Sequence, residues 1–158
     1  MGVPPNRDMV TQPMADHEAV IDRYYEEMFT DGDTDVAEEI FAEDIRYHGP
    51  RSVTPGTLSS VSQVKAFVNR YHAAFPDIEY EVESVFGDGE EVAVRWHSTG
   101  THTEELFGID GQGEEYSGTG LNMFRFEDGK ITEVWSYWDT LGMVRELGLV
   151  SPVGMSGE

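Results

Sequence analysis

Two residues in the segment VRWHST have side chains suited to handling protons and oxygen atoms. Arg95 and His97 are separated by one residue, so in an extended strand they share a face, opposite Val94 and Trp96. Histidine titrates near neutral pH and can serve as a general base, and a guanidinium donates hydrogen bonds to oxygen. We therefore take His97 and Arg95 as candidate catalytic residues. The alternative is that His97 satisfies a neighbouring polar group and Arg95 neutralises nearby carboxylates.

A second polar group is expected on two strands, 115–126 and 130–138, which a turn at 127–129 joins. A three-residue loop with Gly129 at positive φ would pair Phe126 with Lys130. One face would then carry Asn122, Phe124, Val134 and Ser136, with Asn122 opposite Val134. We take Ser136 as a third candidate catalytic residue and the other three as candidates for binding a substrate. A two-residue turn would instead put Asn122 and Ser136 on opposite faces, and we favour the three-residue loop.

The other face of these two strands is unusually apolar. Its residues are Leu121, Met123, Trp135 and Tyr137. Such a face is unsuited to solvent, so it indicates either a dimer interface or an inner core layer.

Two aromatic residues at strand ends complete the candidate site. Tyr47 ends the strand 44–48 and could orient a substrate or a water, and Trp138 ends the strand 130–138. The alternative is that both are core aromatics. No metal site is expected, because His97 and His102 fall on opposite faces of a strand and no third ligand has metal spacing. No cofactor is expected, since Gly118-Thr119-Gly120 lacks the lysine of a phosphate loop.

Composition limits the possible partners. Acidic residues outnumber basic ones by 31 to 10, for a formal net charge of -21, and cysteine is absent. Such a surface repels nucleic acid and anionic membranes, and carboxylates spread along the whole chain favour adaptation to high salt over a face for a cationic partner. No run approaches the roughly 18 apolar residues of a membrane helix, and the first residues, MGVPPNRDMVTQP, contain no apolar signal core, so we expect a cytoplasmic, halophilic protein.

The order of elements predicts an α+β domain over residues 16–150, with tails at 1–15 and 151–158. Helical spacing of apolar residues indicates helices over 16–30, 34–42 and 60–75, and alternation indicates strands over 78–84 and 92–97. A strand at 44–48 and the two strands 115–126 and 130–138 precede a last short helix, 140–147, capped by Asp139. We expect the N-terminal helices to cover the concave face of a curved antiparallel sheet, with a pocket between them.

Several segments resemble one family. YHGP, VAVRWHSTGTH, FRFEDGKITEVW and WDTLGMVRELG are similar, in this order, to the SnoaL-like polyketide cyclases of the nuclear transport factor 2-like superfamily. The resemblance covers residues 15–148. It implies a cone-shaped barrel that is often dimeric and that hosts cyclases, isomerases and hydrolases as well as non-catalytic binding proteins, so fold alone decides little about activity.

The resemblance also bears on individual positions. The antibiotic-pathway cyclases have a catalytic Asp where this chain has Ser136, and a His where it has Asn122. Epoxide hydrolases of the superfamily match Tyr47, and they place an Arg and an Asp at what resemble the positions of Arg95 and His97. A serine hydroxyl is no base near neutral pH without a neighbour to take its proton.

Two classes of function are therefore predicted. In the first, the chain is a cofactor-independent cyclase, isomerase or hydrolase acting on a small apolar carbonyl compound. In the second, it is a ligand-binding or dimerisation module that has lost the family's catalytic Asp. A homodimer is expected in either case.

Overall fold

The fold is an α+β arrangement of helices on one open, curved sheet. The computed structural model describes residues 16–54 and 56–148, so the tails predicted at 1–15 and 151–158 lie outside the described residues. After an α-helical segment at 16–22, the elements are η1 (Arg23–Thr30), α2 (Val36–Ile40), β1 (Phe41–His48), α3 (Val61–Ala74), β2 (Glu79–Asp88), β3 (Glu91–His102), β4 (Glu114–Glu127), β5 (Lys130–Trp138) and α4 (Thr140–Glu146).

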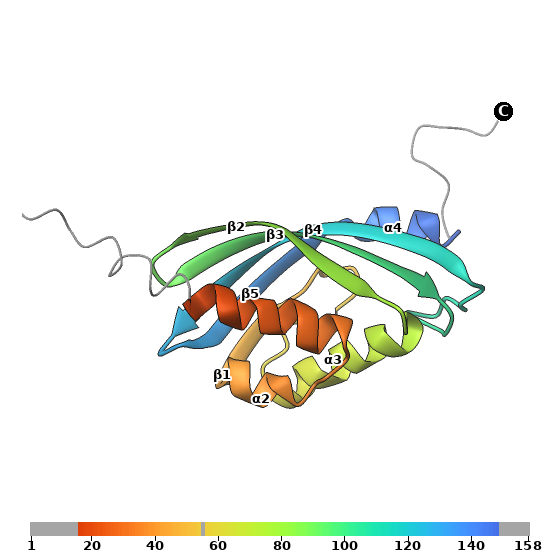
Figure 1. Cartoon of the computed structure of the whole chain (residues 1–158). Helices are drawn as coiled ribbons and strands as arrows, with labels where there is room; N and C mark the ends of the chain where they lie inside the picture. The colour runs from red at the N-terminus through yellow and green to blue at the C-terminus, as the bar shows by residue number, and fades with distance from the viewer. Residues whose placement is uncertain (1–15, 55, 149–158) are drawn as a thin grey trace, which may run out of the picture.

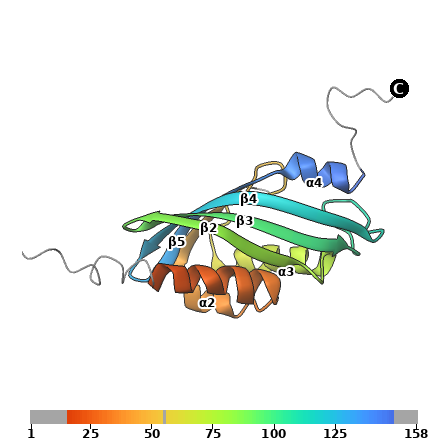
Figure 2. The ribbon, with the colours of Figure 1, turned by 45° about the horizontal axis from the view of Figure 1, so that its top comes forward.

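The five strands are ordered β1-β5-β4-β3-β2. Strands β2 to β5 are antiparallel to one another, whereas β1 runs parallel to β5, so the sheet is mixed where an antiparallel one was expected. Its two edges do not meet. Figure 1 shows η1, α2 and α3 along one side of the sheet, and the turned view in Figure 2 shows α4 on the other side. The predicted α+β fold with N-terminal helices over a curved sheet is confirmed.

The first helix departs from ordinary α-helical geometry. Over Arg23–Thr30 it is a π-helix, and at its end the amide of Asp31 bonds to the carbonyl of Glu26, five residues back. The wider turn buries two adjacent pairs, namely Tyr24, Tyr25, Met28 and Phe29. Such helices are rare and are often found at functional sites. Here the π-helix brings two consecutive tyrosines against the sheet.

Helices α3 and α4 begin where the sequence indicates. The hydroxyl of Ser60 accepts a hydrogen bond from the amide of Gln63 at 3.2 Å, which caps α3. The predicted Asp139 cap of α4 is confirmed, since its Oδ1 accepts from the amide of Gly142 at 2.8 Å. The second helix is shorter than expected, because Phe41 and Ala42 belong to β1.

The turn between β4 and β5 corrects the predicted register. Asp128 (φ 52°) and Gly129 (φ 80°) form a two-residue turn with both residues at positive φ, and Glu127 pairs with Lys130. Beyond the next pair, Phe126 with Ile131, a bulge at Thr132 shifts the register by one residue. Asn122 therefore pairs directly with Ser136, and Phe124 with Val134. The three-residue loop was wrong, but the bulge restores the predicted shared face.

Candidate functional site

A narrow cavity lies between the concave face of the sheet and the helices that cover it. Its volume is about 20 Å³, which is about the space that one water molecule needs. Ten of its lining residues are aromatic, and three of the remainder are small and polar. The lining consists of Tyr24, Tyr25, Phe29, Tyr47, Phe67, Tyr71, Ile78, Tyr80, Trp96, Ser98, Tyr116, Asn122, Ser136 and Trp138.

Two glycines in β4 leave room for the aromatic wall. A Cβ at Gly120 would lie 2.3 Å from Cζ2 of Trp96, and a Cβ at Gly118 would lie 2.1 Å from the hydroxyl of Tyr116. No side chain fits at such distances without displacing the ring. Glycine at positions 118 and 120 thus allows the aromatic rings of the cavity wall to pack against β4.

A chain of hydrogen bonds crosses the floor of the cavity. The indole Nε1 of Trp96 donates to Oδ1 of Asn122 at 3.1 Å, and Nδ2 of Asn122 donates to the hydroxyl of Tyr24 at 3.4 Å. The hydroxyls of Tyr24 and Tyr47 share a hydrogen bond of 2.8 Å. Asn122 is only 2% exposed, so this network supplies the partners that a buried amide requires.

The tyrosines of the cavity are held in their neutral form. Burial raises the pKa of Tyr24, Tyr25, Tyr71 and Tyr80 well above the ordinary value. For Tyr47, burial raises the pKa, and hydrogen bonds to Tyr24 and Ser136 partly offset the rise. These hydroxyls consequently remain protonated at neutral pH, where they can donate hydrogen bonds but cannot act as bases.

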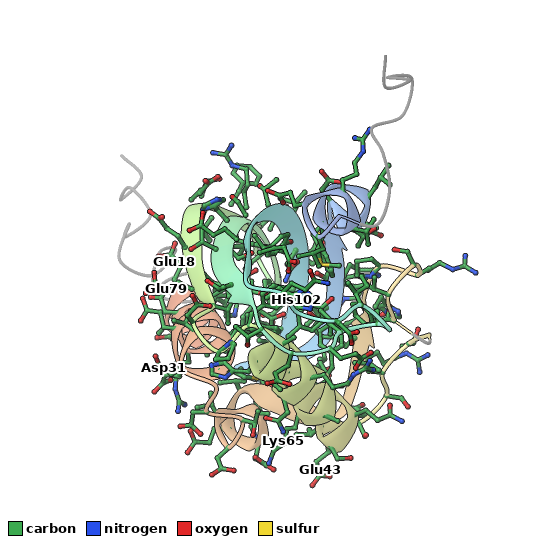
Figure 3. All side chains as sticks on the ribbon, turned by 90° about the vertical axis from the view of Figure 1, so that its right-hand side faces the viewer. Glu18, Asp31, Glu43, Lys65, Glu79 and His102 are labelled. Atoms are coloured by element: carbon green, nitrogen blue, oxygen red, sulfur yellow. The ribbon has the colours of Figure 1, made fainter. Side chains whose placement is uncertain are left out.

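Charged side chains are absent from the lining among the residues that the structure describes: it has no carboxylate, imidazole, ammonium or guanidinium. The acidic residues labelled in Figure 3, Glu18, Asp31, Glu43 and Glu79, lie around the periphery of the molecule. A general base for proton transfer near neutral pH is therefore missing from this wall.

The two predicted catalytic residues of β3 lie on the other face of the sheet. Val94 pairs with Asn122 and Trp96 with Gly120, so Arg95 and His97, which alternate with Val94 and Trp96, face outward. Arg95 is exposed and forms a 3.5 Å ion pair with Glu83. His97 is half-buried and its Nε2 lies 2.8 Å from the hydroxyl of Ser117. The expectation that Arg95 and His97 share a cavity with Asn122 and Ser136 is thus wrong.

The structure does bring together most of the other candidates. Tyr47, Asn122, Ser136 and Trp138 all line the cavity. Phe124 and Val134 lie on the same face but are fully buried in the core and do not line it.

Sequence reasoning missed several lining residues, namely Tyr24, Tyr25, Tyr71, Trp96 and Ser98. Period-two alternation from Trp96 to Ser98 is the signal that could have found Ser98. The helical tyrosines show only the spacing typical of core residues, which does not distinguish a residue that lines a cavity.

Comparison with known proteins assigns the family. The family model of the SnoaL-like polyketide cyclases matches residues 19–147. The chain belongs to this family. Aklanonic acid methyl ester cyclase DnrD of Streptomyces peucetius is 29% identical over 127 residues, which cover 77% of this chain and 84% of DnrD.

Solved structures of SnoaL-like proteins agree with this assignment. IdmH of Streptomyces antibioticus, a proposed polyketide cyclase, is 31% identical with a TM-score of 0.74, over 84% of this chain and 98% of IdmH. A proposed SnoaL-like polyketide cyclase from Jannaschia sp. CCS1 has a TM-score of 0.79 at 21% identity, over 96% of this chain and 100% of that protein, and shows the shared fold alone.

Proposed function

We propose that this SnoaL-like protein binds a small uncharged carbonyl compound in the cavity between sheet and helices. The observation that carries the proposal is the aromatic lining, in which neutral hydrogen-bond donors converge from several elements. Tyr47, Asn122 and Ser136 would hold the carbonyl oxygen, and the surrounding rings would pack on the apolar part of the ligand.

Entry of a ligand requires the cavity to widen, since its volume of about 20 Å³ holds no more than a water-sized guest. Three aromatic side chains of the lining are half-buried and so have space to turn outward, namely Phe67, Tyr80 and Trp138. Movement of side chains is a common response to binding, while the backbone stays in place.

Binding without acid–base turnover is the role that the lining supports best. Ser136 stands where the resemblance places the catalytic Asp of the antibiotic-pathway cyclases, and the cavity tyrosines stay protonated near neutral pH. A cyclase-type reaction is the second candidate, favoured by the relationship to DnrD and IdmH. In it, Asn122 and Tyr47 would donate hydrogen bonds to the carbonyl oxygen and so polarise it.

The binding proposal is tested with 2-acetylnaphthalene, a neutral aromatic ketone. We expect it to raise the melting temperature of the wild type, because a ligand that binds only the folded state stabilises it. Ser136→Leu fills the cavity and should abolish the shift, and Ser117→Leu, a matched change on the exposed face of β4, should preserve it. Circular dichroism checks that each variant folds. Equal shifts in the two variants would contradict the proposal.

We also propose a homodimer through the outer face of β4 and β5. Leu121, Met123 and Tyr137 are 50%, 39% and 66% exposed there, and Leu121 pairs with Tyr137 as Met123 pairs with Trp135. A face this apolar on a monomer is a common mark of an interface. Leu121→Glu should yield a monomer in sedimentation velocity, whereas Ala66→Glu, on an exposed position of α3, should leave the dimer intact. A monomeric wild type would refute the proposal.

The acidic surface is proposed to be an adaptation to high salt. Mutual repulsion among charges that sum to -21 destabilises the folded chain, and about 1 M salt shortens the Debye length to about 3 Å. The melting temperature should rise steeply between 0.1 M and 1 M NaCl. No rise over this range would contradict the halophilic assignment.

A further inference from the structure

Two hydroxyl groups in the cavity have no hydrogen-bond partner among the described residues. Tyr25 and Tyr71 are 1% and 6% exposed, both line the cavity, and the hydroxyl oxygen of each is buried and unpaired. The hydroxyls of Tyr24 and Tyr47, by contrast, bond to each other. Phenylalanine would fill nearly the same volume at Tyr25 or Tyr71 without burying an unpaired polar group, so packing does not account for these hydroxyls.

The two unpaired hydroxyls belong to different parts of the helical wall. The ring of Tyr25, in η1, lies 6.0 Å from that of Tyr80, whereas the ring of Tyr71, in α3, lies 5.9 Å from that of Trp138. Both helices approach the sheet from the same side (Figure 1). A flat ligand between helices and sheet would therefore meet Tyr25 and Tyr71 on one side and the Asn122 network on the other.

The same lining selects against charge. No described lining residue carries a charge that could pair with an ionised ligand, and burying an unpaired charge is strongly unfavourable. Aromatic rings can hold a quaternary ammonium through cation–π contacts. Such a cation, however, offers no hydrogen-bonding group to Tyr25 or Tyr71.

We propose that Tyr25 and Tyr71 determine ligand specificity by binding two separate oxygen substituents of an uncharged, flat aromatic molecule. This inference rests on the proposed binding role of the cavity. It adds the two residues that distinguish an oxygenated ligand from one without oxygen substituents.

The test measures calorimetric affinities for naphthalene derivatives that differ only in polar substituents. The probes are naphthalene, 2-naphthol, 2,6-dihydroxynaphthalene and 2-naphthoate, with phenyltrimethylammonium as the cation. Wild type should bind the diol most tightly and the two ions least. Tyr25→Phe and Tyr71→Phe should each weaken diol binding about tenfold, because one hydrogen bond is lost, and leave naphthalene binding unchanged.

Tyr137→Phe, on the exposed outer face, is the matched control and should bind every probe as the wild type does. Because Tyr25→Phe and Tyr71→Phe remove no hydrogen bond of the free protein, both variants should melt at or above the wild-type temperature. If a variant melts at or above the wild-type temperature and still binds the diol more weakly, the loss of affinity reflects lost recognition and not a folding defect.

The remaining outcomes separate this inference from the proposed function. If naphthalene binds as tightly as the diol, or if both variants keep full affinity for the diol, the specificity role is overturned while the cavity remains a binding site. Tighter binding of either ion overturns the neutral ligand class. If neither these probes nor 2-acetylnaphthalene binds, the proposed function itself fails.

Discussion

The two faces of strands β3 to β5 have opposite chemistry although their residues alternate along the same chain. The concave face carries Trp96, Asn122 and Ser136, all of which are neutral. Trp96 and Asn122 are hydrogen-bonded to each other, and Ser136 lines the same cavity. The convex face combines the exposed apolar patch of β4 and β5 with charged residues such as Arg95 and Glu133, which form ion pairs in or near solvent. The sheet therefore separates charge from the cavity, and any chemistry inside relies on neutral donors.

The largest expected effect comes from placing a charge on the neutral face. Ser136→Asp buries a carboxyl, whose pKa should rise by about 3 units, and each unit corresponds to about 1.4 kcal/mol. Since the raised pKa favours the protonated form, we expect about 4 kcal/mol of lost stability at pH 8 and a much smaller loss at pH 5. Urea unfolding at both pH values measures it. Ser117→Asp, on the exposed face, should change stability little at either pH. An equal loss of stability there would show that the two faces of the sheet do not differ in how they tolerate a carboxylate.

Disrupting the polar network should have the next largest effect. Asn122→Leu leaves the indole N–H of Trp96 without its acceptor and removes a hydrogen-bond partner of Tyr24. We expect it to lower the free energy of unfolding by about 2 to 3 kcal/mol. Leu121→Ala, at the neighbouring but half-exposed position, should cost less than 1 kcal/mol in monomeric protein. Equal losses from the two substitutions would show that the network contributes nothing of its own.

Alkaline titration tests the neutral tyrosines of the cavity. Because burial raises the folded-state pKa of Tyr24 above the ordinary value of about 10, its contribution to stability is complete below pH 10 and is lost as the pH rises through the folded value. Each such tyrosine should lower the free energy of unfolding by up to about 1.4 kcal/mol per pH unit above pH 10. Tyr80→Phe should reduce this slope by one such increment. An unchanged slope would mean that Tyr80 ionises as readily in the folded state as in the unfolded chain.

The smallest effect is expected from the charged face. Arg95→Ala and His97→Ala should change stability by less than about 0.5 kcal/mol and should leave the affinity for 2-acetylnaphthalene unchanged, because neither side chain reaches the cavity. Calorimetric titration of both variants measures this. A severalfold loss of affinity in His97→Ala would return this residue to the candidate site.

Periodicity in the sequence predicted most of the fold and the shared face of β4 and β5. It could not relate β3 to β4, because residues 103–113 form a long loop and only a tight turn fixes register by its length. Arg95 and His97 were therefore assigned to the wrong face. The bulge at Thr132 was equally invisible, since nothing in its residue type marks an extra position in the strand.

The tyrosines of η1 show a different limit. Tyr24 and Tyr25 are both buried, but a pattern of burial does not reveal which hydroxyl finds a partner. That distinction depends on contacts with residues far away in the chain, such as Tyr47 and Asn122.

We propose that ligands bind on the neutral concave face, and the tryptophans provide a direct test. The chain has three tryptophans: Trp96 and Trp138 line the cavity, and Trp135 lies on the outer face. Titration with 2-acetylnaphthalene, followed by NMR of the three indole N–H signals, reports on both faces at once. We expect the Trp96 and Trp138 signals to shift and the Trp135 signal to stay in place. A shift of the Trp135 signal alone would contradict it.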